Sequence, residues 1–135
     1  MTEAILFLTL SEVEDMHADQ IREFGGSIGV RNLDGLKSAV AQPEAVFGDE
    51  YLHQGLFEMA AAYAFHIAEN QPFVDGNKRT ALNAALNFLA LNGFEVVDGE
   101  GLLYPAMIGL SDRKWNKPAL AVLLERLSIP WKDET

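Results

Sequence analysis

Two stretches in the middle of the chain are apolar on nearly every helical face. The first runs from His53 to Asn70 and the second from Asn77 to Leu91, and both are rich in alanine. A helix that is apolar all round is buried, so the pattern predicts two central helices that pack as the core pair. Gln71-Pro72 ends the first helix and Asn92-Gly93 ends the second. The segment from Gln71 to Gly76 is therefore predicted to join the two central helices.

An amphipathic helix is predicted ahead of this pair. Thr9-Leu10-Ser11-Glu12 has the Thr-x-x-Glu spacing of a capping box, and apolar residues then recur at helical intervals from Leu10 to Phe24. Gly25-Gly26-Ser27-Ile28-Gly29 accepts positive φ and offers little packing, which predicts a loop. Asn32 is placed to cap a second, shorter helix that stops before Pro43.

The remaining segments predict smaller elements. Residues 44–51 lack helical periodicity, which indicates an exposed flap or loop, and Phe94 to Val97 is a short extended segment. Leu102 to Leu110 and Ala119 to Leu127 are further helix candidates. Four side chains are expected to pack among these last helices: Tyr104, Trp115, Leu123 and Trp131. The prediction is an all-α fold of five to six helices with a short flap or extended segment, in a single domain spanning residues 1–135.

Composition narrows the classes of partner. The 135 residues carry 20 acidic and 10 basic side chains, a formal charge of −10, so the overall field repels phosphate backbones and anionic lipids. No apolar run approaches the ~20 residues that span a bilayer, and we identify no signal peptide. The absence of cysteine excludes disulfides and thiolate chemistry and agrees with a reducing compartment. We therefore expect a cytoplasmic protein with no direct contact to nucleic acid or membrane.

The start of the second central helix carries the candidate chemistry. Backbone N–H groups at a helix N-terminus lack intrahelical partners and carry partial positive charge, which suits anions. Asp75 and Gly76 precede this terminus, and Asn77, Lys78 and Arg79 open it. Gly76 permits close backbone approach, and the next three side chains supply an amide, a point charge and a planar fork for phosphate oxygens. Asp75 is placed to hold a magnesium ion that bridges the phosphates.

A structural role for these residues is equally compatible with the local pattern. Lysine and arginine normally favour helix C-termini, so their place at a helix start is unusual, and a bound anion would resolve the conflict. In the alternative, Asp75 caps the helix while Lys78 and Arg79 face solvent or pair with the many acidic residues.

The segment from Gln71 to Ala81 resembles the signature of the Fic/Doc superfamily, His-Pro-Phe-x-Asp-Gly-Asn-(Gly or Lys)-Arg. Lys78 stands where the adenylylating Fic branch has glycine, which makes the motif similar to that of the death-on-curing (Doc) branch. The resemblance covers most of the chain through four further blocks: Gly25 to Arg31, Leu36 to Ala39 with Pro43, Phe88-Leu89, and Asn92-Gly93.

This resemblance implies a compact helical core and transfer of a phosphoryl group from ATP to a protein hydroxyl. Doc-type toxins are understood to phosphorylate elongation factor Tu, which blocks translation, and a cognate antitoxin silences them. Carried onto this chain, Asp75 would bind Mg²⁺, and Phe73 would anchor the loop in the core. The resemblance implies a phosphate site formed by Gly76, Asn77, Lys78 and Arg79, with Lys78 and Arg79 also stabilising the transferred group.

Gln71 departs from the motif, because the family has its catalytic histidine at this position. Imidazole, with an unperturbed pKa of about 6.5, suits a general base, whereas an amide cannot take the proton. Gln71 can still orient a hydroxyl, and loss of a general base typically costs ~10²–10⁴-fold, so we expect a strongly impaired catalyst that is not necessarily inactive. Three origins of Gln71 stay open: a deliberate inactivating substitution, a natural pseudoenzyme, or a natural variant with altered chemistry.

The other histidines offer no obvious replacement. His66 lies about 140° around the helix from Gln71, so we expect it to pack in the core away from the site. His17 and His53 are predicted to be surface or flap residues. No His/Asp/Glu grouping has zinc-ligand spacing.

Two further functions remain compatible with the sequence. A non-catalytic module would bind nucleotide or a partner without turnover, which Gln71 favours, whereas the intact Asp75, Asn77, Lys78 and Arg79 favour the kinase. Transfer of a nucleotide monophosphate, as in Fic proteins, is disfavoured by the bulk and charge of Lys78.

Overall fold

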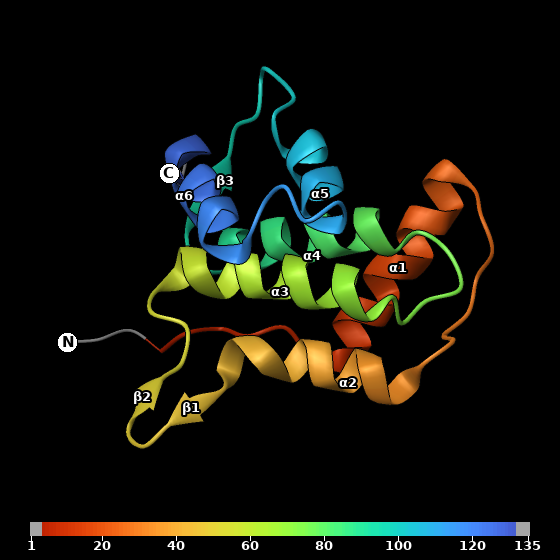
Figure 1. Ribbon diagram of the computed structural model, residues 1–135, viewed down its shortest axis with the longest axis horizontal. Coiled ribbons are helices and arrows are strands. Elements are labelled where there is room, and N and C mark those ends of the chain that lie inside the picture. The colour runs from red at the N-terminus through yellow and green to blue at the C-terminus, as the bar shows by residue number, and fades with distance from the viewer. Residues whose placement is uncertain (1–3, 132–135) are drawn as a thin grey trace.

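Across residues 4–131, which the computed structural model describes, six α-helices and two small antiparallel sheets make up the fold (Figure 1). The helices are α1 (Leu10–Phe24), α2 (Leu33–Ala41), α3 (Leu56–Asn70), α4 (Asn77–Leu91), α5 (Leu103–Ser111) and α6 (Lys117–Leu127), with a 3-10 turn at Gln42–Glu44. The strands are β1 (Val46–Phe47), β2 (Glu50–Tyr51), β3 (Phe94–Val96) and β4 (Ser128–Pro130). The predicted all-α architecture is therefore confirmed.

The helices α3 and α4 form the centre of the molecule. Figure 1 shows them side by side, with α2 below them, α5 and α6 above, and α1 beside the end where α3 joins α4. Seven alanines of the two helices are fully buried: Ala60, Ala61, Ala62, Ala64, Ala81, Ala84 and Ala85. Such small side chains allow two helix backbones to approach closely, while Tyr63 and Phe88 fill the larger spaces in the core.

Local chemistry sets the helix ends. In α1, the Thr9 hydroxyl accepts from the Glu12 N–H at 3.1 Å and the Glu12 carboxylate accepts from the Thr9 N–H at 2.8 Å, so the predicted capping box is present. The Asn32 side chain accepts from the Gly35 N–H at 2.9 Å and caps α2, also as predicted. Helix α3 begins at Leu56 rather than at the predicted His53, because Gly55 has a φ of 92°, which is incompatible with a right-handed helix.

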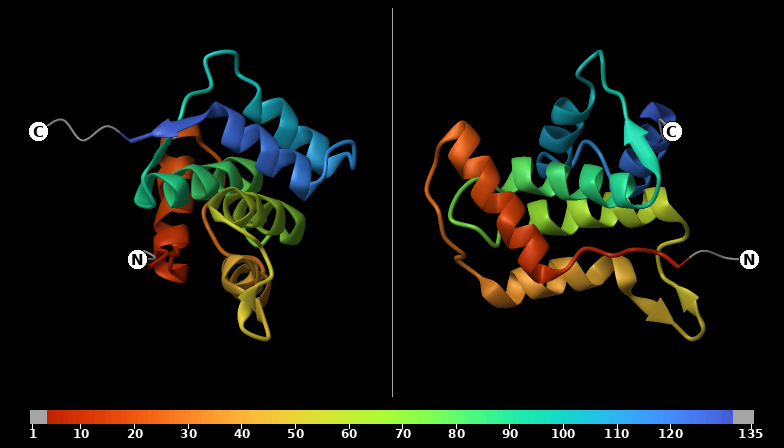
Figure 2. Two further views of the ribbon diagram at one scale, coloured as in Figure 1. Left: turned by 90° about the vertical axis from the view of Figure 1, so that its left-hand side faces the viewer. Right: turned by 180° about the vertical axis from the view of Figure 1, so that it is seen from behind.

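The short strands lie at one end of the molecule. The predicted flap is the hairpin β1–β2, in which Val46 pairs with Tyr51. In Figures 1 and 2 this hairpin extends from the start of α3, at the opposite end from the segment that joins α3 to α4. The predicted extended segment is β3, and it pairs with β4, which was not predicted. Helices α1, α3 and α4 thus support the joining segment at the end remote from both sheets.

Two of the four side chains expected to pack among the last helices are exposed. Leu123 is buried and Trp115 lies against Gly109, as predicted. The prediction is wrong for Tyr104 and Trp131, which are 46% and 57% exposed. Tyr104 is on the outer face of α5, because Leu103 and Met107 occupy the face that turns toward the core.

Candidate functional site

The motif loop, residues 71–76, turns the chain between the two central helices. Gln71 ends α3 in the left-handed conformation, with φ 44° and ψ 56°. Gly76 is also left-handed, with φ 75° and ψ 21°, and immediately precedes α4. No side chain caps this terminus. The first N–H groups of α4 therefore remain directed at the space in front of the helix, as an anion site requires.

The side chain of Asn77 holds this loop in shape. Its oxygen accepts from the Phe73 N–H at 2.9 Å, and its amide nitrogen donates to the Phe73 carbonyl at 3.0 Å. Phe73 is fully buried, which confirms that it anchors the loop in the core. Both ends of the Asn77 amide are engaged by the loop, so its side chain shapes the site. Its position at the start of α4 leaves its backbone N–H without an intrahelical partner, as is typical of the first turn of a helix.

His17 of α1 fixes the same loop from the other side. Its ring stacks on Phe73 with centroids 3.8 Å apart and planes within 4°, and its Nε2 donates to the Asp75 carbonyl at 2.8 Å. The prediction of a surface position is wrong, because His17 is only 3% exposed. The sequence did contain a signal, since His17 lies four residues from both Val13 and Ile21 on the apolar stripe of α1.

The α1–α2 loop binds the motif loop along its length. The Gly29 carbonyl accepts from the Val74 N–H at 3.0 Å, and the Pro72 carbonyl accepts from the Arg31 N–H at 2.7 Å. The Arg31 guanidinium donates to the Gln71 carbonyl at 2.8 Å. These bonds join segments about 40 residues apart, so the glycine-rich block identified in the sequence serves as a clamp on the motif loop.

The Asp75 carboxylate points toward this clamp. One oxygen accepts from the Gly76 N–H at 2.9 Å and the other from the Ser27 N–H at 3.3 Å. A Cβ atom at Gly26 would lie 2.7 Å from the Asp75 carboxylate, so this close approach requires glycine. The carboxylate is solvent-exposed and keeps free lone pairs, which fits a magnesium ion held by one carboxylate, phosphates and water.

A cavity of about 330 Å³ brings the predicted residues together. We call it the phosphate cavity, after the ligand predicted for it from the sequence; it is lined by Ala68, Gln71, Val74, Asp75, Gly76, Asn77, Lys78, Arg79 and Tyr104. The Arg79 guanidinium also lies 4.6 Å from the centre of the Phe24 ring, a cation–π contact that orients it. The place of Tyr104 in this cavity was not predicted from the sequence, because Tyr104 lies far from the motif in the sequence and no nearby residue pattern marks it.

The other two histidines form a separate group with Lys117 at the start of α6. The Lys117 ammonium donates to His53 Nε2 at 3.0 Å and to His66 Nε2 at 3.1 Å. Burial, together with Lys117, lowers the pKa of His66 to about 4 and also lowers the pKa of His53. His66 does not line the phosphate cavity, as predicted. The prediction of a surface position for His53 is wrong: it is buried, because it packs between α3 and α6 as a partner of Lys117.

Comparison with known proteins finds one matching protein family and two similar proteins. Residues 7–89 match the Fic/DOC family. The chain is 42% identical to "Toxin Doc" of Mycolicibacterium smegmatis over 73 residues, which are 54% of this chain and 56% of that toxin. It is 32% identical to "Protein kinase doc" of Escherichia phage P1 over 116 residues, which are 86% of this chain and 90% of that kinase. The first match thus spans little more than half of its relative, and the second spans most of both chains.

Proposed function

This chain belongs to the Fic/Doc family, and from that membership we propose that it is a Doc-type toxin that transfers the γ-phosphoryl group of ATP to a protein hydroxyl. One observation carries the proposal. The phosphate cavity unites a helix N-terminus, Lys78, Arg79 and an accessible carboxylate at Asp75. These are the parts that phosphoryl transfer needs, because its catalysis consists chiefly of positioning and of stabilising charge.

Each residue has a role in this proposal. The N–H groups at the start of α4 and the side chains of Lys78 and Arg79 hold the phosphate oxygens. Asp75 holds Mg²⁺, which when bound neutralises charge on the phosphates. Asn77, His17 and the clamp keep the loop in the required shape before the nucleotide arrives.

Gln71 lies where the resemblance places a catalytic histidine, and it lines the phosphate cavity. Its amide can donate a hydrogen bond to an acceptor hydroxyl but cannot remove the proton. We therefore propose a kinase that is slower than its Gln71→His form, by ~10²–10⁴-fold if no other group takes the proton. By resemblance to Doc-type toxins, the acceptor is elongation factor Tu, the setting is the cytoplasm, and a cognate antitoxin is the partner that restrains the toxin.

Transfer of label from γ-labelled ATP to elongation factor Tu tests this proposal. The protein, its Gln71→His form and its Asp75→Asn form are compared with magnesium present. We expect slow labelling by the protein, faster labelling by Gln71→His, and none by Asp75→Asn. Absence of labelling by both the protein and Gln71→His, with nucleotide still bound, would contradict the kinase assignment.

A second candidate rests on Gln71 itself. Without an imidazole at this position, the phosphate cavity would serve a pseudoenzyme that binds nucleotide or a partner protein without turnover. Calorimetric binding of ATP with no transfer by either the protein or Gln71→His would favour this candidate. Labelling of the target from the α-phosphate of ATP would instead favour nucleotide transfer of the Fic type.

A further inference from the structure

A second cavity adjoins the phosphate cavity at Gln71. Its volume is about 180 Å³, and it is lined on its polar side by Glu69, Gln71, Ser111 and Arg113. Gln71 and Ala68 line both cavities, so the position of the missing histidine lies between them. A space of this size can admit the side chain of serine or threonine, the two residues that carry an aliphatic hydroxyl.

Backbone conformation distinguishes this second cavity from the rest of the surface. Within residues 4–131, only Gln71 and Arg113 combine a side chain with a clearly positive φ, at 44° and 61°. Both residues line the second cavity. Each follows a helix, where glycine would adopt the same conformation without strain. Strained residues of this kind gather where a side chain has a task that glycine cannot perform.

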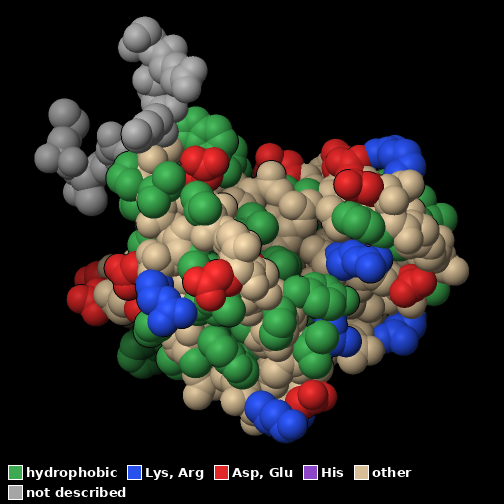
Figure 3. Space-filling view, turned by 90° about the horizontal axis from the view of Figure 1, so that it is seen from above, with side chains coloured by type: hydrophobic (Ala, Val, Ile, Leu, Met, Phe, Trp, Pro, Cys, Tyr) green, Lys and Arg blue, Asp and Glu red, His purple; other side chains and the backbone are tan. Residues whose placement is uncertain are grey.

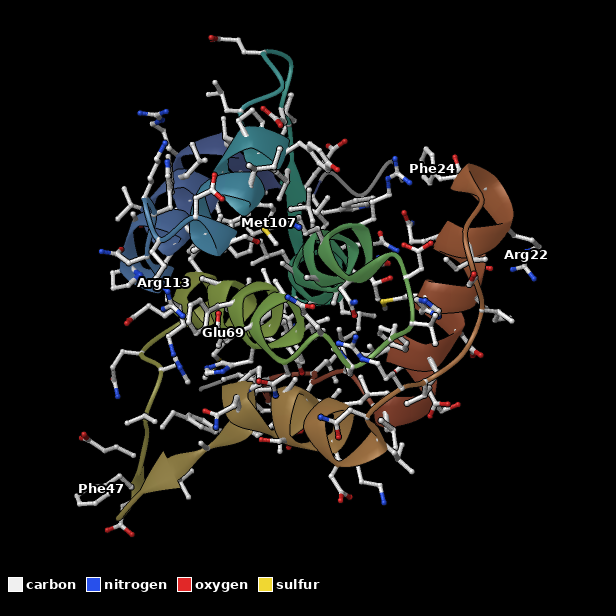
Figure 4. All side chains as sticks on the ribbon, turned by 45° about the vertical axis from the view of Figure 1, so that its right-hand side comes forward. Arg22, Phe24, Phe47, Glu69, Met107 and Arg113 are labelled. Carbon is white, nitrogen blue, oxygen red and sulfur yellow. The ribbon has the colours of Figure 1, made fainter. Side chains whose placement is uncertain are left out.

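Glu69 places a carboxylate in this cavity. Its Oε1 lies 3.6 Å from the Arg113 guanidinium, and Figure 4 shows the two side chains near one another, from α3 and from the segment that follows α5. The Glu69 side chain is 44% exposed and that of Arg113 is 82% exposed, so the carboxylate remains accessible to a ligand. An ion pair this exposed contributes little to stability, so Glu69 can be substituted without a large effect on folding.

We propose that the second cavity receives the acceptor hydroxyl and that Glu69 is its general base, in place of the absent imidazole. The inference rests on the kinase function proposed above. The hydroxyl oxygen forms a bond to the γ-phosphorus of ATP, and the bond from that phosphorus to the β–γ bridging oxygen breaks. ADP leaves with the electron pair of the broken bond, and the hydroxyl proton passes to the Glu69 carboxylate. Arg113 is a positioning residue that holds the carboxylate.

Four forms of the full chain test this inference: the protein, Glu69→Gln, Gln71→His, and the double variant with both changes. If Glu69 takes the proton, Glu69→Gln slows transfer to elongation factor Tu by about 10²-fold or more. In the Gln71→His background the same change has little effect, about threefold at most, because the introduced imidazole takes the proton. A merely structural role would give the same loss in both backgrounds.

The split between kcat and KM supplies an independent readout. The background dependence of the loss also shows in kcat, because a base acts in the transfer step: Glu69→Gln should lower kcat in the protein and leave it nearly unchanged in the Gln71→His background. Glu58→Gln is the matched control, because Glu58 is an exposed glutamate of the same helix that does not line the second cavity. It should leave transfer unchanged.

Three results would overturn the inference. Equal losses from Glu69→Gln in both backgrounds, or an unchanged rate in the first, exclude Glu69 as the base. Transfer by Gln71→His with none by the protein shows that no other group replaces the imidazole, while the kinase function stands. Absence of transfer by both of these forms refutes the kinase function and the role of Glu69 with it.

Discussion

Gly26 of the clamp lies close to the motif loop. Its φ is 117°, and the Asp75 carboxylate occupies the space that a Cβ atom would need. The neighbouring Gly25 also has a positive φ, of 83°, yet nothing lies within 4 Å of a Cβ atom at that position. Alanine substitutions at the two glycines can therefore distinguish the effect of backbone strain, present at both, from a steric clash with Asp75, present only at Gly26.

We predict that Gly26→Ala weakens magnesium-dependent nucleotide binding by at least about tenfold, since about 1.4 kcal/mol lost at Asp75 corresponds to that factor. Gly25→Ala should have a similar strain cost, on the order of 1 kcal/mol, and retain binding. Calorimetric titration with ATP and magnesium, with thermal unfolding measured in parallel, checks both variants. Equal binding losses in the two variants would mean that strain alone, and not contact with Asp75, is responsible.

For single residues, the sequence predicted which residues belong to the site better than it predicted which residues they contact. Phe73 was predicted to anchor the motif loop and does so, because burial of a large apolar side chain in the core is strongly favoured over its exposure to water. Asn77 was expected to hold phosphate, and the bonds that its side chain makes are with Phe73. The contact between Arg31 and Gln71 joins residues 40 positions apart, which no local pattern in one sequence indicates.

Among the elements, those with strong local signals were predicted most closely. The capping box of α1 and the Asn92-Gly93 end of α4 gave bounds that agree with the structure. The strand β4 was missed, because it forms by pairing with Phe94 and Val96 of β3, which lie more than thirty residues earlier in the chain. Helix ends are encoded by nearby residues, whereas pairing between two strands far apart in the sequence depends on the tertiary structure that brings them together.

The junction between α3 and α6 contains an unusual arrangement of basic groups. Lys117 donates to His53 and His66, and these bonds require both imidazoles to be neutral. The pKa of His66 falls from 6.5 to about 4, chiefly because the ring is desolvated. Between these two values the unfolded chain binds more protons than the folded protein, so acid favours unfolding.

We predict that the free energy of unfolding falls as the pH decreases from 7 to 5. The stability from neutral His66 is fully present above pH 6.5 and is lost as the pH approaches 4. Urea unfolding at several pH values measures this loss. In His66→Gln the number of protons linked to unfolding should drop by up to about one, while His53 retains the rest of the effect. If His66→Gln has the same pH dependence of unfolding as the protein, His66 is not the cause of the lost stability.

At the scale of the whole molecule, the net charge opposes the binding of the proposed anionic ligand. The formal charge is −10, and Figure 3 shows acidic and basic side chains interspersed with apolar ones on the face seen from above. Lys78 and Arg79 therefore act locally, within a field that repels phosphate at a distance. No helix within residues 4–131 has the length and hydrophobicity needed to cross a membrane.

Both described ends of the chain are fastened to the same end of α4. The Asn92 side chain accepts from the Leu6 N–H at 3.0 Å and donates to the Leu6 carbonyl at 2.9 Å. The Trp131 N–H donates to the Gly93 carbonyl at 2.8 Å. Helix α4 has 15 residues, so its other end, where the phosphate cavity opens, lies about 22 Å away.

This separation makes the protein suited to attachment on a sensor surface. Leu6 and Trp131, close to the two ends of the described residues, lie at the far end of α4, so protein linked at position 6 or 131 should bind ATP with the affinity measured in solution. Because the chain has no cysteine, Val74→Cys gives a single alternative attachment point inside the phosphate cavity. Surface plasmon resonance should then show ATP binding on protein attached at position 6 or 131 and its loss on protein attached through position 74.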